Sequence, residues 1–184
     1  SDLKQSNNSY NSSVLSNDGF QLDQIKALPD VASTQKYIAV SGILRNEHNF
    51  AGIIFKGVGK DFDSARFRKF IVKGRIPAFT EKRFDSGILI SQKIATDLHL
   101  GVKDSIVAIF SKENQSPLYR QFEVAGIYKT DIKLIDDVFI IGGINHGRRI
   151  QGMKDSEIGG IDIFLKNINY IDEDAPKIDQ LVGY

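Results

Sequence analysis

Residues 87–104 read Gly-Ile-Leu-Ile-Ser-Gln-Lys-Ile-Ala-Thr-Asp-Leu-His-Leu-Gly-Val-Lys-Asp, and this stretch decides the fold class. The apolar run at 87–90 predicts a short buried strand, and Ser91 is a suitable N-cap for a helix directly after it. The helix has one apolar face, made of Ile94, Ala95 and Leu98. We expect Gly101 to end this helix. A buried strand that leads into a short helix indicates a fold that combines both kinds of element.

The patterns on both sides of this stretch predict mainly strands. Pro29 stops a helix over residues 22–28, and a hairpin follows, with strands over 32–44 and 50–58 around a polar loop. Further elements are expected as strands over 105–110, 119–128, 137–141 and 161–165 and as a last helix over 172–181. The first nineteen residues, rich in Ser and Asn, predict a frayed or strand-like lead-in. We therefore predict an α+β fold with mixed, largely antiparallel sheets.

The overall composition argues against several function classes. The 184 residues, 41% of them hydrophobic, can build one medium domain or two small ones. The formal net charge of +1 does not fit the basic stripe of a nucleic-acid-binding protein or the polybasic cluster of a membrane-surface protein, so we expect no nucleic-acid partner. The absence of cysteine excludes disulfides, a thiolate nucleophile and Cys-ligated metals. No apolar run approaches the length of about 20 residues that spans a bilayer.

No motif in the sequence predicts a catalytic or metal site. The Gly-Val-Gly-Lys turn at 57–60 is followed by Asp61 instead of the Ser or Thr of a phosphate-binding loop. The three histidines fall in separate elements, and we expect exposed or loop positions for all of them: His48, His99 and His146. The acidic pair at 136 and 137 is expected in a strand, where neighbours point to opposite faces, and the pair at 61 and 63 is expected to cap or to be solvated. We expect no enzyme activity and no cofactor.

The segment from Lys60 to Pro77 mixes aromatic and basic residues, a combination that can bind single-stranded nucleic acid by base stacking. Phe67 and Phe70 are three residues apart, which is the spacing of one buried helical face. We therefore favour packing of these rings in the core over nucleic-acid binding.

Residues 87–104 also resemble a block that recurs in the extracytoplasmic domains of MacB-type permeases, a family that includes the lipoprotein-releasing LolC and LolE proteins and, more distantly, FtsX. The matching residues are Ile90, Ser91, Ala95, Leu98, Leu100 and Asp104. Lys103 departs from the pattern, because it stands where the family usually has glycine. Residues 122–130 resemble the family's Phe-x-Val-x-Gly-Ile strand; Asp136 matches an Asp that follows it, and Asp131 replaces a frequent glycine. Shorter similarities lie at 55–58, 72–74 and 158–163.

The resemblance implies a division into two subdomains. A porter-like α/β subdomain would comprise residues 1–75 and 156–184, and a mainly β, sabre-like subdomain over 76–155 would be inserted in it. The chain, which starts at Ser1 without an initiator Met, would be a segment of a longer protein of the bacterial inner membrane, on its periplasmic side. The implied partners are a cytoplasmic ABC ATPase, a second permease subunit in a homodimer or heterodimer, and an exported substrate or periplasmic partner protein.

The implied function is mechanical: the domain transmits motion from ATP hydrolysis to the export or release of a substrate, with lipoproteins as one candidate class. Because function is often placed in loops on a rigid scaffold, we expect partner contacts in two polar loops between strands. The expected contact residues are Arg45, Asn46, His48 and Asn49 in the first loop and Lys112, Asn114 and Gln115 in the second. The alternative function is a non-catalytic binding or adhesion module of a bacterial surface lipoprotein. A hydrolase that uses the acidic pairs is a third hypothesis.

Overall fold

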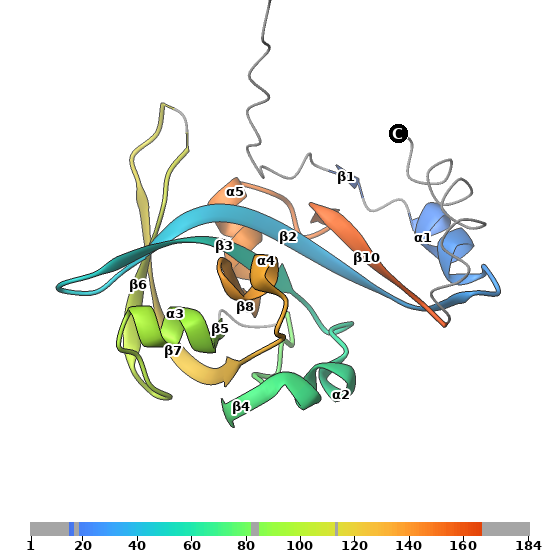
Figure 1. Ribbon diagram of the computed structural model, residues 1–184. Coiled ribbons are helices and arrows are strands. Elements are labelled where there is room, and N and C mark those ends of the chain that lie inside the picture. Colours follow the sequence, from blue (N-terminus) through green and yellow to red (C-terminus); the bar gives the residue numbers. More distant parts are fainter. Residues whose placement is uncertain (1–14, 17–18, 82–84, 113, 167–184) are drawn as a thin grey trace, which may run out of the picture.

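The computed structural model describes residues 15–16, 19–81, 85–112 and 114–166 (Figure 1). The predicted helix over 172–181 and most of the first nineteen residues lie outside this part of the chain. The strands are β1 (Leu15–Ser16), β2 (Val31–Arg45), β3 (Phe50–Val58), β4 (Ile71–Gly74), β5 (Gly87–Ser91), β6 (Ser105–Phe110), β7 (Leu118–Tyr128), β8 (Phe139–Gly143), β9 (Glu157–Ile158) and β10 (Gly160–Leu165). The helices are α1 (Gly19–Lys26), α2 (Ser64–Phe67), the 3-10 helix η1 (Arg68–Phe70), α3 (Gln92–Asp97), α4 (Lys133–Asp136) and α5 (Ile144–Gln151).

An eight-stranded sheet forms the centre of the molecule. Its order is β10-β2-β3-β8-β5-β7-β4, and β6 pairs with both β2 and β7. The strands β2, β3, β8, β5, β7 and β6 therefore close into a ring, to which β10 and β4 are added at the sides. Among the described strands of this sheet, the pairs β3–β8 and β5–β7 are parallel and the others antiparallel. The prediction of an α+β fold with mixed, largely antiparallel strands is confirmed.

The main hydrophobic core fills the ring. It contains Ile38 and Phe55 from the first hairpin, Ile88 from β5 and Phe122 from β7, all fully buried. The Phe55 and Phe122 rings stack with their centroids 5.5 Å apart. A second cluster around Val58, Leu89, Tyr128 and Ile141 packs on the outer side against the aromatic residues that precede β4. Strands from distant parts of the sequence thus share one core.

Helix α5 was not predicted from the sequence. A strand over 137–141 is predicted, but β8 continues through Gly143, and α5 follows immediately. The helix is rich in polar residues, and its buried side chains include His146 and Arg148 as well as isoleucines. The expectation of an exposed or loop position is wrong for His146, because the helix packs it against the stacked rings of Phe55 and Phe122, at a steep angle to both. Because buried polar side chains do not contribute to an apolar periodicity, the sequence pattern did not predict this helix.

Two local details also differ from the predictions. Helix α3 ends at Asp97, and His99, with φ 53°, takes the left-handed position after it instead of Gly101. Asp136 belongs to the short helix α4 and not to a strand. The described residues contain no helix that is long and apolar enough to cross a membrane.

Candidate functional site

The first predicted contact loop is the tip of the β2–β3 hairpin. Asn46 organises it: its Oδ1 accepts hydrogen bonds from the backbone N–H groups of His48 (3.0 Å) and Asn49 (2.7 Å). The Nδ2 group of Asn46 donates to the carbonyl oxygen of Leu98 (2.7 Å), which fixes the tip to the end of α3. Arg45 and His48 are exposed, and Asn49 is half-buried. The loop therefore offers Arg45 and His48 to a partner, whereas the Asn46 side chain is engaged within the domain.

The second predicted contact loop joins β6 to β7. Lys112 donates from Nζ to the carbonyl oxygen of Gln151 at the end of α5. Asn114 and Gln115 are exposed, and Asn114 has φ 59°. This loop therefore presents Asn114 and Gln115 outward, whereas Lys112 connects the loop to α5.

The two loops lie in different places. In the antiparallel β2–β6 pair, Arg45 lies opposite Val107 and Ile43 opposite Ile109, so the two loops extend from opposite ends of this pairing. Figure 1 shows the hairpin tips pointing in different directions, one to the left and one upward. The loop residues therefore remain predicted partner contacts, and they lie on two separate surfaces.

An apolar groove that the sequence did not reveal as a site lies beside α2, α4 and β10. Its volume is about 580 Å³, within the usual range for small-ligand sites. Segments far apart in the chain line it: Phe62, Phe67 and Phe70 around α2 and η1, Ile132 and Ile135 around α4, and Ile161 and Ile163 of β10. The spacing of Phe67 and Phe70 predicted burial, and both rings are half-buried against the Tyr128 side of the second cluster. These rings form a wall of the groove.

A few polar groups lie at the groove. Lys56 Nζ is 2.6 Å from Asp162 Oδ2, and Gln35 Nε2 donates to the same oxygen at 3.2 Å. Arg66 lies over the ring of Phe164 at 4.6 Å and is 3.4 Å from Asp63. Each cation at the groove thus has an acidic neighbour, so a bound group would meet an apolar wall and two internally paired charges.

The buried titratable groups have structural partners. Burial raises the pKa of Tyr128 above its usual range, and its hydroxyl donates to the carbonyl oxygen of Phe139 (2.7 Å). Burial lowers the pKa of His146, whose Nε2 lies 2.8 Å from the carbonyl oxygen of Asp85. Asp61 and Asp63 bind backbone N–H groups, Asp63 as the N-cap of α2. Within the described ranges, no three His, Cys, Asp or Glu side chains are grouped so that they could hold a metal ion.

Comparison with known proteins finds similarity at the level of structure. No family model and no curated protein matches the sequence. The extracellular domain of the ABC-type transporter YknZ from Gram-positive bacteria superposes with a TM-score of 0.59 and 14% identity, over 89% of this chain and 80% of that one. The periplasmic region of MacB from Actinobacillus actinomycetemcomitans has a TM-score of 0.56 and 15% identity, over 89% of this chain and 73% of that one. The chain shares its fold with these two transporter domains.

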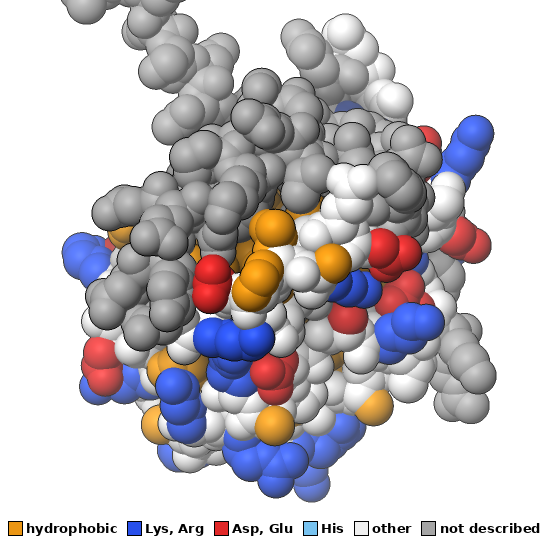
Figure 2. All heavy atoms as spheres, turned by 90° about the vertical axis from the view of Figure 1, so that its right-hand side faces the viewer, with side chains coloured by type: hydrophobic (Ala, Val, Ile, Leu, Met, Phe, Trp, Pro, Cys, Tyr) orange, Lys and Arg blue, Asp and Glu red, His pale blue; other side chains and the backbone are white. Residues whose placement is uncertain are grey.

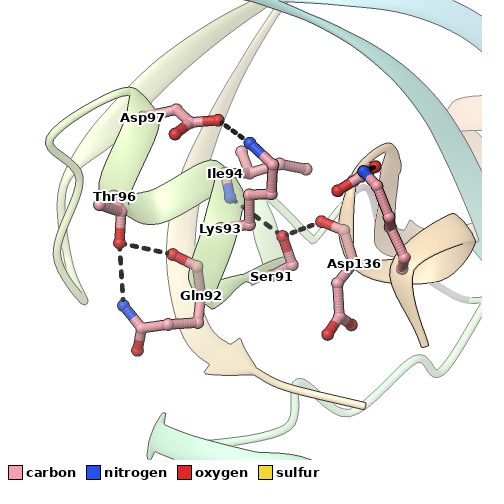
Figure 3. A network of polar contacts seen from close by, with 9 residues as sticks. Ser91, Gln92, Lys93, Ile94, Thr96, Asp97 and Asp136 are labelled. Atoms are coloured by element: carbon pink, nitrogen blue, oxygen red, sulfur yellow. Dashed lines mark hydrogen bonds and ion pairs between the residues drawn. The ribbon is translucent and has the colours of Figure 1, made fainter. Parts of the chain in front are cut away.

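The residues that carried the sequence resemblance build this shared fold locally. Ser91 Oγ accepts a hydrogen bond from the Ile94 N–H (3.0 Å) and donates to the carbonyl oxygen of Asp136 (2.5 Å), so that it caps α3 and ties it to α4 (Figure 3). The Asp136 carboxylate accepts hydrogen bonds from Thr130 Oγ1 (2.7 Å) and from the N–H of Asp131 (3.0 Å). The two motifs therefore meet at the contact between α3 and α4. The described hydrogen bonds of Ser91 and Asp136 hold these elements together, so both residues have structural roles.

Proposed function

We propose that this chain is the extracytoplasmic domain of an ABC transporter permease, held on the periplasmic side of the bacterial inner membrane. In this proposal, ATP hydrolysis by a cytoplasmic ABC ATPase moves the membrane helices of two permease subunits, and the domain transmits that motion to export or release of a substrate. The observation that supports it is the fold shared with two transporter domains over 89% of the chain.

The physical properties of the domain suit a mechanical part. A part that transmits motion has to move without deforming, and a closed ring of strands around one packed core resists deformation. Conformational change performs work only if a substrate or partner binds the two states with different affinity. The proposed contacts are therefore the exposed side chains of the two hairpin loops, Arg45 and His48 on one and Asn114 and Gln115 on the other.

The first test is the gene that encodes the parent protein. The proposal requires an apolar segment of about 20 residues before this stretch and three more after it. A lipoprotein signal without later membrane spans would instead assign the chain to a surface binding module and overturn the proposal.

The second test measures the motion in the assembled transporter. This segment contributes no cysteine of its own, so, in a transporter whose other cysteines have been replaced, spin labels can be placed at S41C and A65C, two exposed positions. Within one domain, the distance between these labels is expected to stay constant through the ATPase cycle. Between single A65C labels on two permease subunits, the distance is expected to change when ATP is hydrolysed. An unchanged distance between subunits would contradict transmission of motion by this domain.

A further inference from the structure

A strongly basic ridge lies on a molecule whose net charge is only +1. Residues 64–80, which form α2, η1, β4 and the chain after them, contain five cations and no acidic residue. The cations are Arg66, Arg68, Lys69, Lys73 and Arg75, and all five are exposed. The near-neutral total therefore conceals a local charge that the composition could not reveal.

The packing of the aromatic residues explains why the cations point outward. The Phe67 ring lies 5.4 Å from that of Tyr128 and 5.5 Å from that of Phe70, on the inner side of the segment. The alternating basic residues are left on the outer side. Figure 2 shows Lys and Arg side chains gathered toward the lower end of one face, the level of α2 and β4 in Figure 1, with hydrophobic side chains scattered among them.

Most of this charge has no ion-pair partner among the residues that the structure describes. Arg66 lies 3.4 Å from Asp63, and Lys69 lies over the ring of Phe70 at 5.0 Å. Within the described part of the chain, none of the ion pairs involves Arg68, Lys73 or Arg75. Their positive field therefore extends into solvent over a screening length of about 8 Å at physiological salt.

Exposed aliphatic side chains accompany the ridge. Val72 in β4 is 50% exposed, and the adjoining α4 region exposes Ile132 (52%) and Leu134 (82%). The Lys129 N–H donates to the carbonyl oxygen of Phe70 at 2.9 Å, and Ile132 lines the same groove as Phe70, so the chain that leads into α4 adjoins the ridge. Cations beside protruding aliphatic groups are the composition of surfaces that lie in the interface of a membrane, where headgroups meet the cations and the aliphatic groups enter the acyl boundary.

We infer that this basic ridge, with Val72, Ile132 and Leu134, binds the anionic phospholipid surface of a membrane. The inference rests on the proposed function, because a domain tethered to a membrane meets that surface at high local concentration. Stacking with single-stranded nucleic acid requires exposed aromatic rings, whereas Phe67 and Phe70 are half-buried and pack against each other, Phe67 also against Tyr128. Each cation near an anionic surface strengthens partitioning about fivefold, so the five give weak, reversible binding that a moving domain can make and break.

The test is co-sedimentation of the 184-residue chain with phospholipid vesicles. We expect binding to vesicles that contain phosphatidylglycerol, much weaker binding to pure phosphatidylcholine, and loss of binding in about 1 M salt, where the screening length is about 3 Å. The double variant R68E/K73E is expected to bind the anionic vesicles at least about 25-fold more weakly. The control K26E/K154E changes the net charge equally at exposed sites, at the end of α1 and just after α5, and Figure 1 shows these helices on the opposite side from α2 and β4. It is expected to stay within about twofold of the unchanged chain.

A third variant tests the aliphatic part of the ridge. Leu134→Ala alters a side chain that is 82% exposed, so the fold is expected to be retained while binding to anionic vesicles falls a few-fold. Equal losses for R68E/K73E and K26E/K154E, or equal binding to both kinds of vesicle, would overturn the inference. Retention on immobilised heparin with no vesicle binding would also overturn it, in favour of an acidic macromolecule. These outcomes are separate from the proposed function, which the parent gene and the label distances test independently.

Discussion

Gly74 and Gly52 differ in the space that the fold leaves for a side chain. Gly74 ends β4 with φ +76°, and a Cβ atom there would lie 2.3 Å from the carbonyl oxygen of Ala125. Around Gly52 in β3, a Cβ atom would meet nothing within 4 Å. We predict that Gly74→Ala lowers the free energy of unfolding by about 3 kcal/mol, through left-handed strain plus the contact with backbone. Gly52→Ala is predicted to change it by less than about 0.5 kcal/mol in the same urea titration. Similar losses for both variants would contradict this account.

His146 makes the stability depend on pH. Burial, the largest cause, lowers its pKa in the folded state, and the nearby Arg120 and Arg149 act in the same direction, while Asp85 opposes them. In the unfolded chain the histidine titrates near 6.5. Protonation therefore favours the unfolded state, and this contribution to stability is present above about pH 6.5 and is lost as the pH falls toward the lower folded pKa. We predict that His146→Gln flattens the fall of the urea midpoint between about pH 7 and 5.5. An unchanged slope would assign the pH dependence to other groups.

Elements whose residues carry their own signal were predictable, and elements that depend on distant polar partners were not. The strands β3 and β6 and the Ser91 cap of α3 occur at the predicted positions, because apolar periodicity and capping are local properties. Helix α5 depends on Arg148, whose partner Glu81 lies 67 residues earlier in the chain. The groove was missed for the same reason, because its wall comes from α2, α4 and β10 together. Only its Phe67–Phe70 component has a local signal.

The Arg148–Glu81 pair tests how α5 is attached. The two charged groups are 3.1 Å apart, and their side chains are 9% and 28% exposed. Removal of one partner leaves the other poorly solvated, so we predict that Arg148→Met and Glu81→Gln each reduce stability by about 2–3 kcal/mol. The double variant is predicted to lose clearly less than the sum in a double-mutant cycle. The control is Lys93→Met at the solvent-exposed Lys93–Asp97 pair, which is predicted to reduce stability much less than either substitution at the buried pair. Additive losses at the buried pair would mean that the two side chains do not stabilise each other.

At the scale of the whole molecule, the ring of strands predicts a single unfolding unit. The subdomains predicted from the sequence meet near residues 75 and 155, and that division stays a prediction. The strands β2 and β3 on one side of it and β5, β6, β7 and β8 on the other belong to one ring. Because Phe55 of β3 and Phe122 of β7 also share the main core, neither part can lose its packing without exposing the core of the other.

We therefore predict one cooperative transition in urea, with the same midpoint by far-UV circular dichroism and by the fluorescence of the six tyrosines. The β2–β6 pairing, which joins only three residues on each strand, closes the ring, so substitution of the fully buried Leu44 there by Ala should shift both signals together. Hydrogen exchange should then show similar protection in β3 and β7 in the unchanged domain. Two separate transitions, with protection lost first over 76–155, would instead establish two independent subdomains and move the hinge of the proposed motion inside this chain.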